Sequence, residues 1–81
     1  MRHPKRIRTI YATYNVTFEF ETLPPMTHRG TVAGSSGAVL CARAVRQAQT
    51  KLRPVNWSSM VCVLLERVAR SVSTFDESEV A

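Results

Sequence analysis

The sequence predicts an α+β fold: a three-stranded antiparallel sheet with one helix packed on one of its faces. Three observations carry this prediction. Apolar residues alternate with period two over residues 9–22, and from Ala38 their spacing changes to three and four. An apolar, β-branched run after Trp57 favours a third strand. The expected order of elements is strand, strand, helix, strand.

Residues 9–22, TIYATYNVTFEFET, form the longest predicted strand. Polar residues alternate along it with an apolar set that would share one buried face: Ile10, Ala12, Tyr14, Val16, Phe18 and Phe20. Pro24 and Pro25 end the strand, because proline supplies no N–H to a ladder. Residues 27–33, THRGTVA, form a shorter strand that is weakly apolar and interrupted by Gly30, as an edge strand can be.

The helix is predicted to begin after the turn GSSG at residues 34–37, where either serine can cap its N-terminus. Its apolar stripe is expected to contain Ala38, Cys41, Val45, Ala48 and Leu52. Pro54 ends the helix near Arg53, because proline biases the residue before it away from the helical conformation.

The third strand is predicted over residues 57–66, although the apolar spacing over 60–68 also suits a helix. As a strand it is apolar on both faces, with Val61, Val63 and Leu65 on one and Met60, Cys62 and Leu64 on the other. One helix covers only one face of a sheet. The second face is therefore expected to be covered by the C-terminal segment, a second copy of the chain or a partner protein.

The connections favour the spatial order 2-1-3, with the longest strand in the centre, since a right-handed crossover returns the third strand parallel to the second. The central strand extends about 40 Å over some twelve residues, whereas a helix of about sixteen residues covers about 24 Å. The strand must therefore bend, or one end must project beyond the helix.

The 81 residues are expected to form a single domain over 9–70, with a basic arm at 1–8 and an acidic, flexible tail at 71–81. The net charge of +5 comes from two segments without acids, 1–8 and 41–55. There is no apolar run of the roughly 20 residues that span a bilayer and no signal-peptide pattern. We therefore expect a cytoplasmic protein with no membrane contact, in which Cys41 and Cys62 are buried, reduced thiols.

The sequence offers no set of residues for catalysis, and we expect neither an enzyme nor a metal or cofactor site. His3 and His28 stand in no recognised motif. Glu19 and Glu21 share a strand face, but solvated positions on an exposed sheet face explain them better than a metal site. The turn before the helix has the composition of an anion cradle, yet such turns are far more often simple caps.

Binding is therefore the expected function, and two hypotheses remain open. The first is protein–protein binding, as a homodimer or with a host protein, through an interface of Trp57, Met60, Cys62 and Leu64. The alternative is nucleic-acid binding, to DNA or RNA, through the helix and the arm. Its basic residues are Arg43, Arg46, Lys51 and Arg53 on the helix, and Arg2, Lys5, Arg6 and Arg8 in the arm. The ordinary explanation of the helix residues is a polar face turned to water.

Residues 23–32, LPPMTHRGTV, and 53–68, RPVNWSSMVCVLLERV, resemble short uncharacterised proteins of Mu-like transposable bacteriophages. The resemblance covers roughly residues 9–68 and transfers no catalytic or binding residue. It implies a viral protein made in the bacterial cytoplasm, of a kind that often acts by binding a host protein or nucleic acid.

Overall fold

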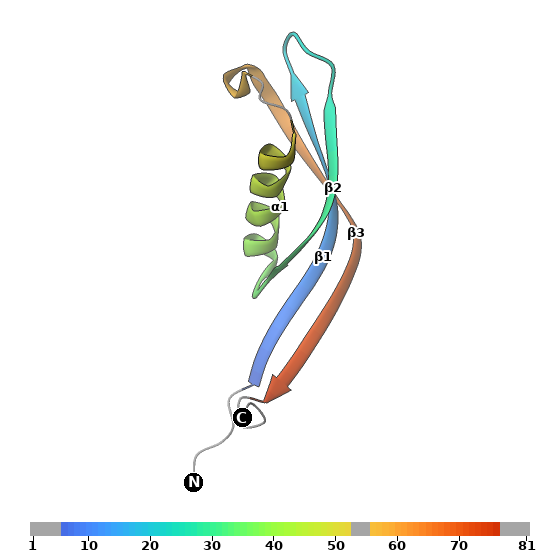
Figure 1. Cartoon of the computed structure of the whole chain (residues 1–81), viewed down its shortest axis with the longest axis vertical. Helices are drawn as coiled ribbons and strands as arrows, with labels where there is room; N and C mark the ends of the chain where they lie inside the picture. The colour runs from blue at the N-terminus through green and yellow to red at the C-terminus, as the bar shows by residue number, and fades with distance from the viewer. Residues whose placement is uncertain (1–5, 53–55, 77–81) are drawn as a thin grey trace.

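The computed structural model describes residues 6–52 and 56–76. The elements are strand β1 (Arg6–Phe20), strand β2 (Met26–Gly34), helix α1 (Gly37–Lys51), the 3-10 turn η1 (Trp57–Ser59) and strand β3 (Met60–Asp76). The strands form one antiparallel sheet in the order β2-β1-β3, and α1 packs on one face of it (Figure 1). This confirms the predicted fold class and strand order, and residues 60–68 are strand rather than helix.

The core forms where the alternating apolar residues of β1 meet α1. The even-numbered residues of β1 from Ile10 to Phe20 point toward the helix, on what we call the helix-side face; the odd-numbered residues point to the outer face. The buried side chains are Ile10, Ala12, Tyr14, Val16, Phe18, Phe20, Val32, Leu40, Ala44 and Ala48. The predicted buried face of β1 is confirmed residue by residue.

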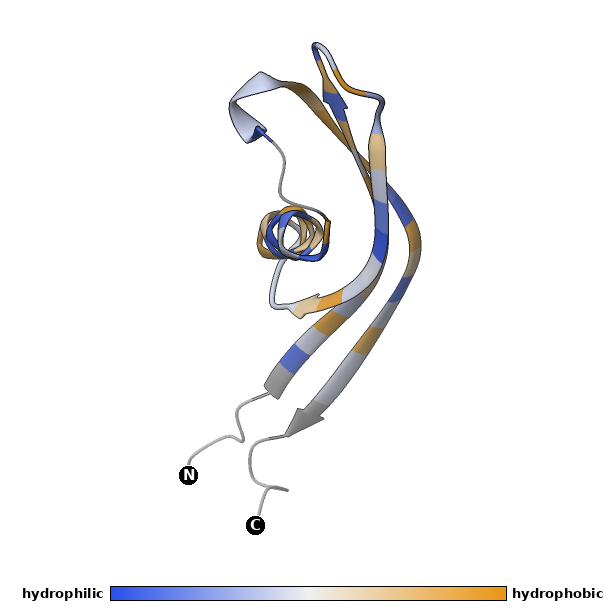
Figure 2. Ribbon diagram, turned by 45° about the horizontal axis from the view of Figure 1, so that its top comes forward, coloured by the Kyte–Doolittle hydropathy of each residue, from blue (hydrophilic) through white to orange (hydrophobic). Residues whose placement is uncertain are grey.

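Helix α1 begins at Gly37 because the Ser36 side chain accepts a hydrogen bond from the backbone N–H of Val39 at 3.4 Å. Its buried stripe consists of Leu40, Ala44 and Ala48, spaced by four. The expected stripe was wrong at Ala38 and Cys41, which are exposed. The reason is the position of the helix: it lies over β2 and the β2 side of β1, so the buried stripe is rotated toward that strand (Figure 2).

Strand β3 contains two irregularities that change which face its residues occupy. Met60 pairs with Phe20 and Val63 with Phe18, so Val61 is an extra residue on β3. Val68 is a second extra residue, because Arg67 pairs with Tyr14 and Ala69 with Thr13. The alternation expected for this strand was therefore wrong at Met60, which lies with Val63 and Leu65 on the helix-side face. It was wrong at Val61 too, which is an extra residue.

The two long strands reach beyond the rest of the fold. β1 begins at Arg6 and β3 continues to Asp76, although residues 6–8 and 71–76 were expected to lie outside the regular structure. Residues 6–8 pair with 74–76, and residues 71–73 pair with 9–11. β2 ends opposite Ile10, which leaves a two-stranded ribbon that projects past α1 (Figure 1). The sheet also curves around the helix (Figure 2). Both outcomes expected from the length mismatch, bending and projection, occur.

Candidate functional site

One edge of the sheet, that of β2, is covered by side chains of α1. Arg43 donates a hydrogen bond from Nη1 to the carbonyl oxygen of Ala33, and Gln47 donates from Nε2 to that of Thr31 at 3.3 Å. Gln47 can approach because Gly30 has no side chain: a Cβ there would lie 2.0 Å from Gln47 Oε1. Two alternate carbonyls of the edge thus already have partners, which protects this edge against pairing with another strand.

The other edge, that of β3, has no further strand beside it among residues 6–52 and 56–76, and we call it the open edge. Alternate residues of a strand direct their N–H and C=O to opposite sides. The carbonyl of Thr31 points away from β1, toward α1. Thr13, which pairs with Thr31, therefore directs its backbone N–H and C=O toward β3, and so do the other odd-numbered residues of β1. The hydrogen bond from Glu21 N–H to the Ser59 carbonyl agrees with this assignment. Residues paired with even-numbered positions of β1, such as Val63 and Leu65, therefore direct their N–H and C=O to solvent.

Several exposed apolar side chains lie along this open edge. The exposed fractions are 69% for Val61, 50% for Leu64, 45% for Val68 and 44% for Val72. Val61 and Val68 are the two extra residues of the strand, which divide the edge into uninterrupted segments at 62–67 and 69–76. The first of these segments is apolar on both faces over residues 62–65, with Val63 and Leu65 half-buried on the helix side, and it ends with the charged Glu66 and Arg67.

The structure separates the four residues of the predicted partner interface. Trp57 packs on the core, with its ring 5.0 Å from that of Phe18 and 5.8 Å from that of Phe20. Met60 also packs on the core from the helix-side face. Only the half-buried Cys62 and the exposed Leu64 lie on the outer face. The grouping of all four in one interface was wrong, because the extra residue Val61 shifts the register.

The outer face of β1 and β2 is largely polar. Threonine hydroxyls pair across β1 and β2, between Thr13 and Thr31 at 2.7 Å and between Thr17 and Thr27 at 2.9 Å. Arg29 donates to the side chain of Asn15 at 2.8 Å, and Asn15 donates to Glu66 at 3.3 Å, across all three strands. A polar, hydrogen-bonded face can stay in water without a cover.

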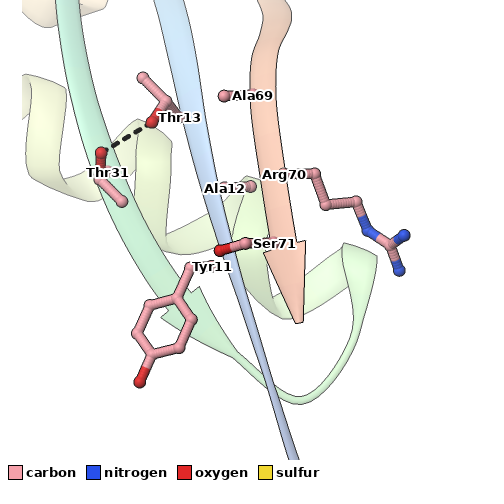
Figure 3. A pocket seen from close by; sticks show the side chains of 7 residues that line it. All are labelled: Tyr11, Ala12, Thr13, Thr31, Ala69, Arg70 and Ser71. Carbon is pink, nitrogen blue, oxygen red and sulfur yellow. Dashed lines mark hydrogen bonds between the residues drawn. The ribbon is translucent and has the colours of Figure 1, made fainter. Parts of the chain in front are cut away.

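A shallow hollow of about 120 Å³ lies in the sheet where the second extra residue disturbs the register (Figure 3). It is lined by Tyr11, Ala12, Thr13, Thr31, Ala69, Arg70 and Ser71. It contains no carboxylate, thiol or imidazole. Within the part of the chain that the structure describes, no three His, Cys, Asp or Glu side chains gather as a metal site would require.

Among the basic residues predicted from the sequence, those whose side chains the structure describes lie on different elements and do not form one surface. On α1, Arg46 and Lys51 are exposed, but the guanidinium of Arg43 is engaged with the Ala33 carbonyl. Arg8 is exposed on the helix-side face of β1, and the backbone of Arg6 belongs to the same strand. Arg2, Lys5 and Arg53 lie outside the described residues.

Two further arginines, Arg67 and Arg70, were not predicted as site residues. Regular alternation places residues three apart on opposite faces of a strand. The extra residue Val68 instead brings both arginines to the helix-side face, opposite Tyr14 and Ala12. Their charges were visible in the sequence, but no sequence signal indicates that they share a face.

Tyr14 lies beside these arginines at the rim of the core. The Cys41 thiol, which was expected to be buried, is exposed and donates a hydrogen bond to the Tyr14 hydroxyl at 4.0 Å. Burial of the ring raises the pKa of Tyr14 above its ordinary value of 10.0, and the interactions with Cys41 raise it further. Arg67 and Arg70 act in the opposite direction, because a nearby positive charge favours the tyrosinate.

Comparisons with known proteins give no match for this chain, whether with family models, curated protein sequences or solved structures. Within the described residues, α1 is too short and too polar to cross a membrane, and no other α-helix is present.

Proposed function

We propose that the protein acts by binding another protein chain along the open edge of β3, and that its first partner is a second copy of itself. The difference between the two edges carries this proposal. The carbonyls of Thr31 and Ala33 on the β2 edge have partners on α1, whereas the β3 edge offers its backbone groups to solvent. A long open edge is a template for strand addition.

Apolar burial would add to the backbone hydrogen bonds of such pairing. Leu64, which lies in the segment 62–67, is 50% exposed. Full burial of a leucine side chain contributes about 1.5 to 3 kcal/mol, so covering this half-exposed side chain contributes about 1 kcal/mol in each copy.

A second copy fits the edge because its own β3 has the apolar side chains that an added strand needs at this position. Residues 62–65 of the segment are apolar on both faces, so a strand added there must also be apolar on both faces. Antiparallel pairing of β3 with β3 of a second copy satisfies this and gives a two-fold interface that uses the same surface twice.

The mass of the purified protein in solution tests the proposal. We expect light scattering to give twice the mass of one chain, and Leu64→Lys to shift the equilibrium toward the monomer, because a lysine on an edge strand opposes pairing. Leu23→Lys is the matched control: Leu23 is 42% exposed in the turn between β1 and β2. It should leave the mass unchanged.

A wild-type monomer at every concentration, or equal masses for Leu64→Lys and the wild type, would overturn the homodimer. The resemblance to phage proteins implies a bacterial cytoplasm as the setting and a host protein as a competing partner for the same edge. A host protein that pairs with β3 should be lost with Leu64→Lys and retained with Leu23→Lys. The proposal assigns no catalytic residue and no cofactor.

A further inference from the structure

A basic surface lies on the helix-side face of β1 and β3, toward the projecting ribbon. Arg67 pairs with Tyr14, and Arg70 is set on the same face by the extra residue Val68. Arg8 lies farther along β1 on this face. All three arginine side chains are exposed, and that of Arg70 extends away from β1 past β3 (Figure 3). We call Arg8, Arg67 and Arg70 the arginine row.

Among the side chains that the structure describes, none on this face offsets the charge of the row. The acidic side chains of the strands whose placement the structure describes are Glu19 and Glu66, and both belong to the outer face, where Glu66 accepts from Asn15. Among the described side chains, no carboxylate shares the helix-side face of β1 and β3 with the arginine row. The two faces of this part of the sheet therefore differ in charge.

The length of the row indicates an extended anion rather than a single small one. Arg8 and Tyr14, the partner of Arg67, are six residue steps apart along β1. At about 3.3 Å per residue this is about 20 Å, too far for three guanidinium groups to meet on one phosphate. It is close to six nucleotide steps of about 3.4 Å along a nucleic-acid strand.

The burial of the aromatic rings on this face favours duplex over single-stranded nucleic acid as the ligand. Binding of single strands depends on exposed aromatic rings on which bases stack. Tyr14, Phe18 and Phe20 of β1 are buried in the core, with exposed fractions of 6%, 0% and 8%. Tyr11 is exposed, but on the outer face. The row thus offers contacts to phosphates without a stacking platform.

We propose that the arginine row contacts the phosphate backbone of duplex DNA, independently of the strand pairing at β3. The affinity is electrostatic and has no base readout, because guanidinium contacts to phosphates carry no sequence information. Arg67 and Arg70 lie at and beyond the end of the segment 62–67, so pairing along that segment does not use their side chains.

The test compares two double variants that remove the same charge. Arg67→Gln with Arg70→Gln removes part of the row, and Arg46→Gln with Lys51→Gln removes two exposed cations of α1. Binding of a fluorescent mixed-sequence DNA duplex is measured by anisotropy between about 50 and 200 mM salt. Each lost phosphate contact lowers the slope of log affinity against log salt by about 0.9, so the row variant should lose about 1.8.

We expect the helix variant, Arg46→Gln with Lys51→Gln, to keep the wild-type slope of log affinity against log salt. The double variant that keeps the charge, Arg67→Lys with Arg70→Lys, should retain most of that slope. Equal losses in the row and helix variants, an unchanged row variant, or no salt-sensitive binding by the wild type would overturn the proposal. Light scattering without DNA separates this test from that of the homodimer. A dimer that ignores DNA contradicts only the arginine row, and a monomer that binds DNA contradicts only the strand pairing.

Discussion

Tyr14 shows how one side chain belongs at once to the core and to the basic surface. Its ring is 6% exposed, its hydroxyl accepts a hydrogen bond from Cys41, and Arg67 and Arg70 lie close enough to affect its pKa. The causes that raise the pKa outweigh the two arginines. The folded protein therefore holds the phenolic proton at a pH where the unfolded chain has released it.

The stability of the protein should consequently fall as the pH rises above the ordinary tyrosine value of about 10, because the folded state then binds more protons than the unfolded state. Tyr14→Phe removes this contribution. We expect the free energy of unfolding to decrease more in the wild type than in Tyr14→Phe between about pH 9 and pH 11. Urea denaturation followed by Trp57 fluorescence measures this, and parallel decreases in both proteins would contradict it.

Gly30 matters because of the side chain that lies over it. An added Cβ would meet Gln47 Oε1 at 2.0 Å and displace the amide that donates to the Thr31 carbonyl. Loss of that hydrogen bond costs about 1 kcal/mol. Replacing glycine in a strand gains about 0.5 to 1 kcal/mol from reduced backbone entropy of the unfolded chain. The two effects nearly cancel.

A double-mutant cycle separates them. Gly30→Ala should change the free energy of unfolding little in the wild type but stabilise the Gln47→Ala variant by about 0.5 to 1 kcal/mol, because the Gln47 amide is then absent and only the end of the His28 ring, 2.9 Å from the added Cβ, must shift. Thermal or urea denaturation of the four proteins gives the coupling. A coupling energy near zero would mean that the Gln47 side chain does not lie over Gly30 and does not protect the β2 edge there.

At the scale of the elements, the contrast between β2 and β3 explains why one strand is a candidate interface. β2 is short and its edge is partly satisfied by α1, whereas β3 runs from Met60 to Asp76 with its outer edge unpaired. The extra residues Val61 and Val68 interrupt that edge and increase its twist. Pairing is therefore expected along 62–67 rather than along the whole strand.

Amide hydrogen exchange can locate the pairing. The amides of Val63 and Leu65 point away from β1, so they should exchange rapidly in the monomer and become protected as the protein concentration rises. The amides of Leu64 and Glu66 are directed to β1 and should be protected at every concentration. Concentration-independent exchange at Val63 and Leu65 in a protein of dimeric mass would place the interface elsewhere.

At the scale of the whole molecule, the fold is elongated, with extents of 61 × 21 × 18 Å. One helix covers the central part of a sheet that is longer than the helix, and the ribbon of β1 and β3 projects beyond it (Figure 1). The radius of gyration of 16.8 Å exceeds the roughly 12 Å expected for a compact chain of this length. A single copy therefore leaves much of β3 uncovered, which agrees with the two surfaces proposed for it.

The two proposed surfaces use different parts of β3. Strand pairing uses the backbone edge at 62–67, and the arginine row uses side chains of the helix-side face from Arg67 toward the ribbon. A dimer formed along 62–67 would carry one arginine row from each copy on one continuous sheet. The Leu64 and Arg67/Arg70 variants should therefore act on mass and on DNA affinity separately.

The amino-acid sequence by itself determined the central strand, the single helix, the strand order and the buried face of β1. These features follow from periodicity within short segments: alternation from Ile10 to Phe20 favours only a strand, and the change of spacing after Ser36 favours only a helix. The capping role of Ser36 was likewise predictable, because a cap depends on residues three positions apart.

Only the tertiary structure decided which side chains share a face of β3 and which edge of the sheet is open. The extra residues Val61 and Val68 arise from the register of β3 on β1, which cross-strand packing sets and the local pattern of β3 does not contain. Each shifts the alternation by one residue, and this moves Met60 into the core and places Arg70 beside Arg67. The cover on β2 likewise depends on where α1 comes to lie, because Arg43 and Gln47 reach the carbonyls of Ala33 and Thr31 only in the folded chain.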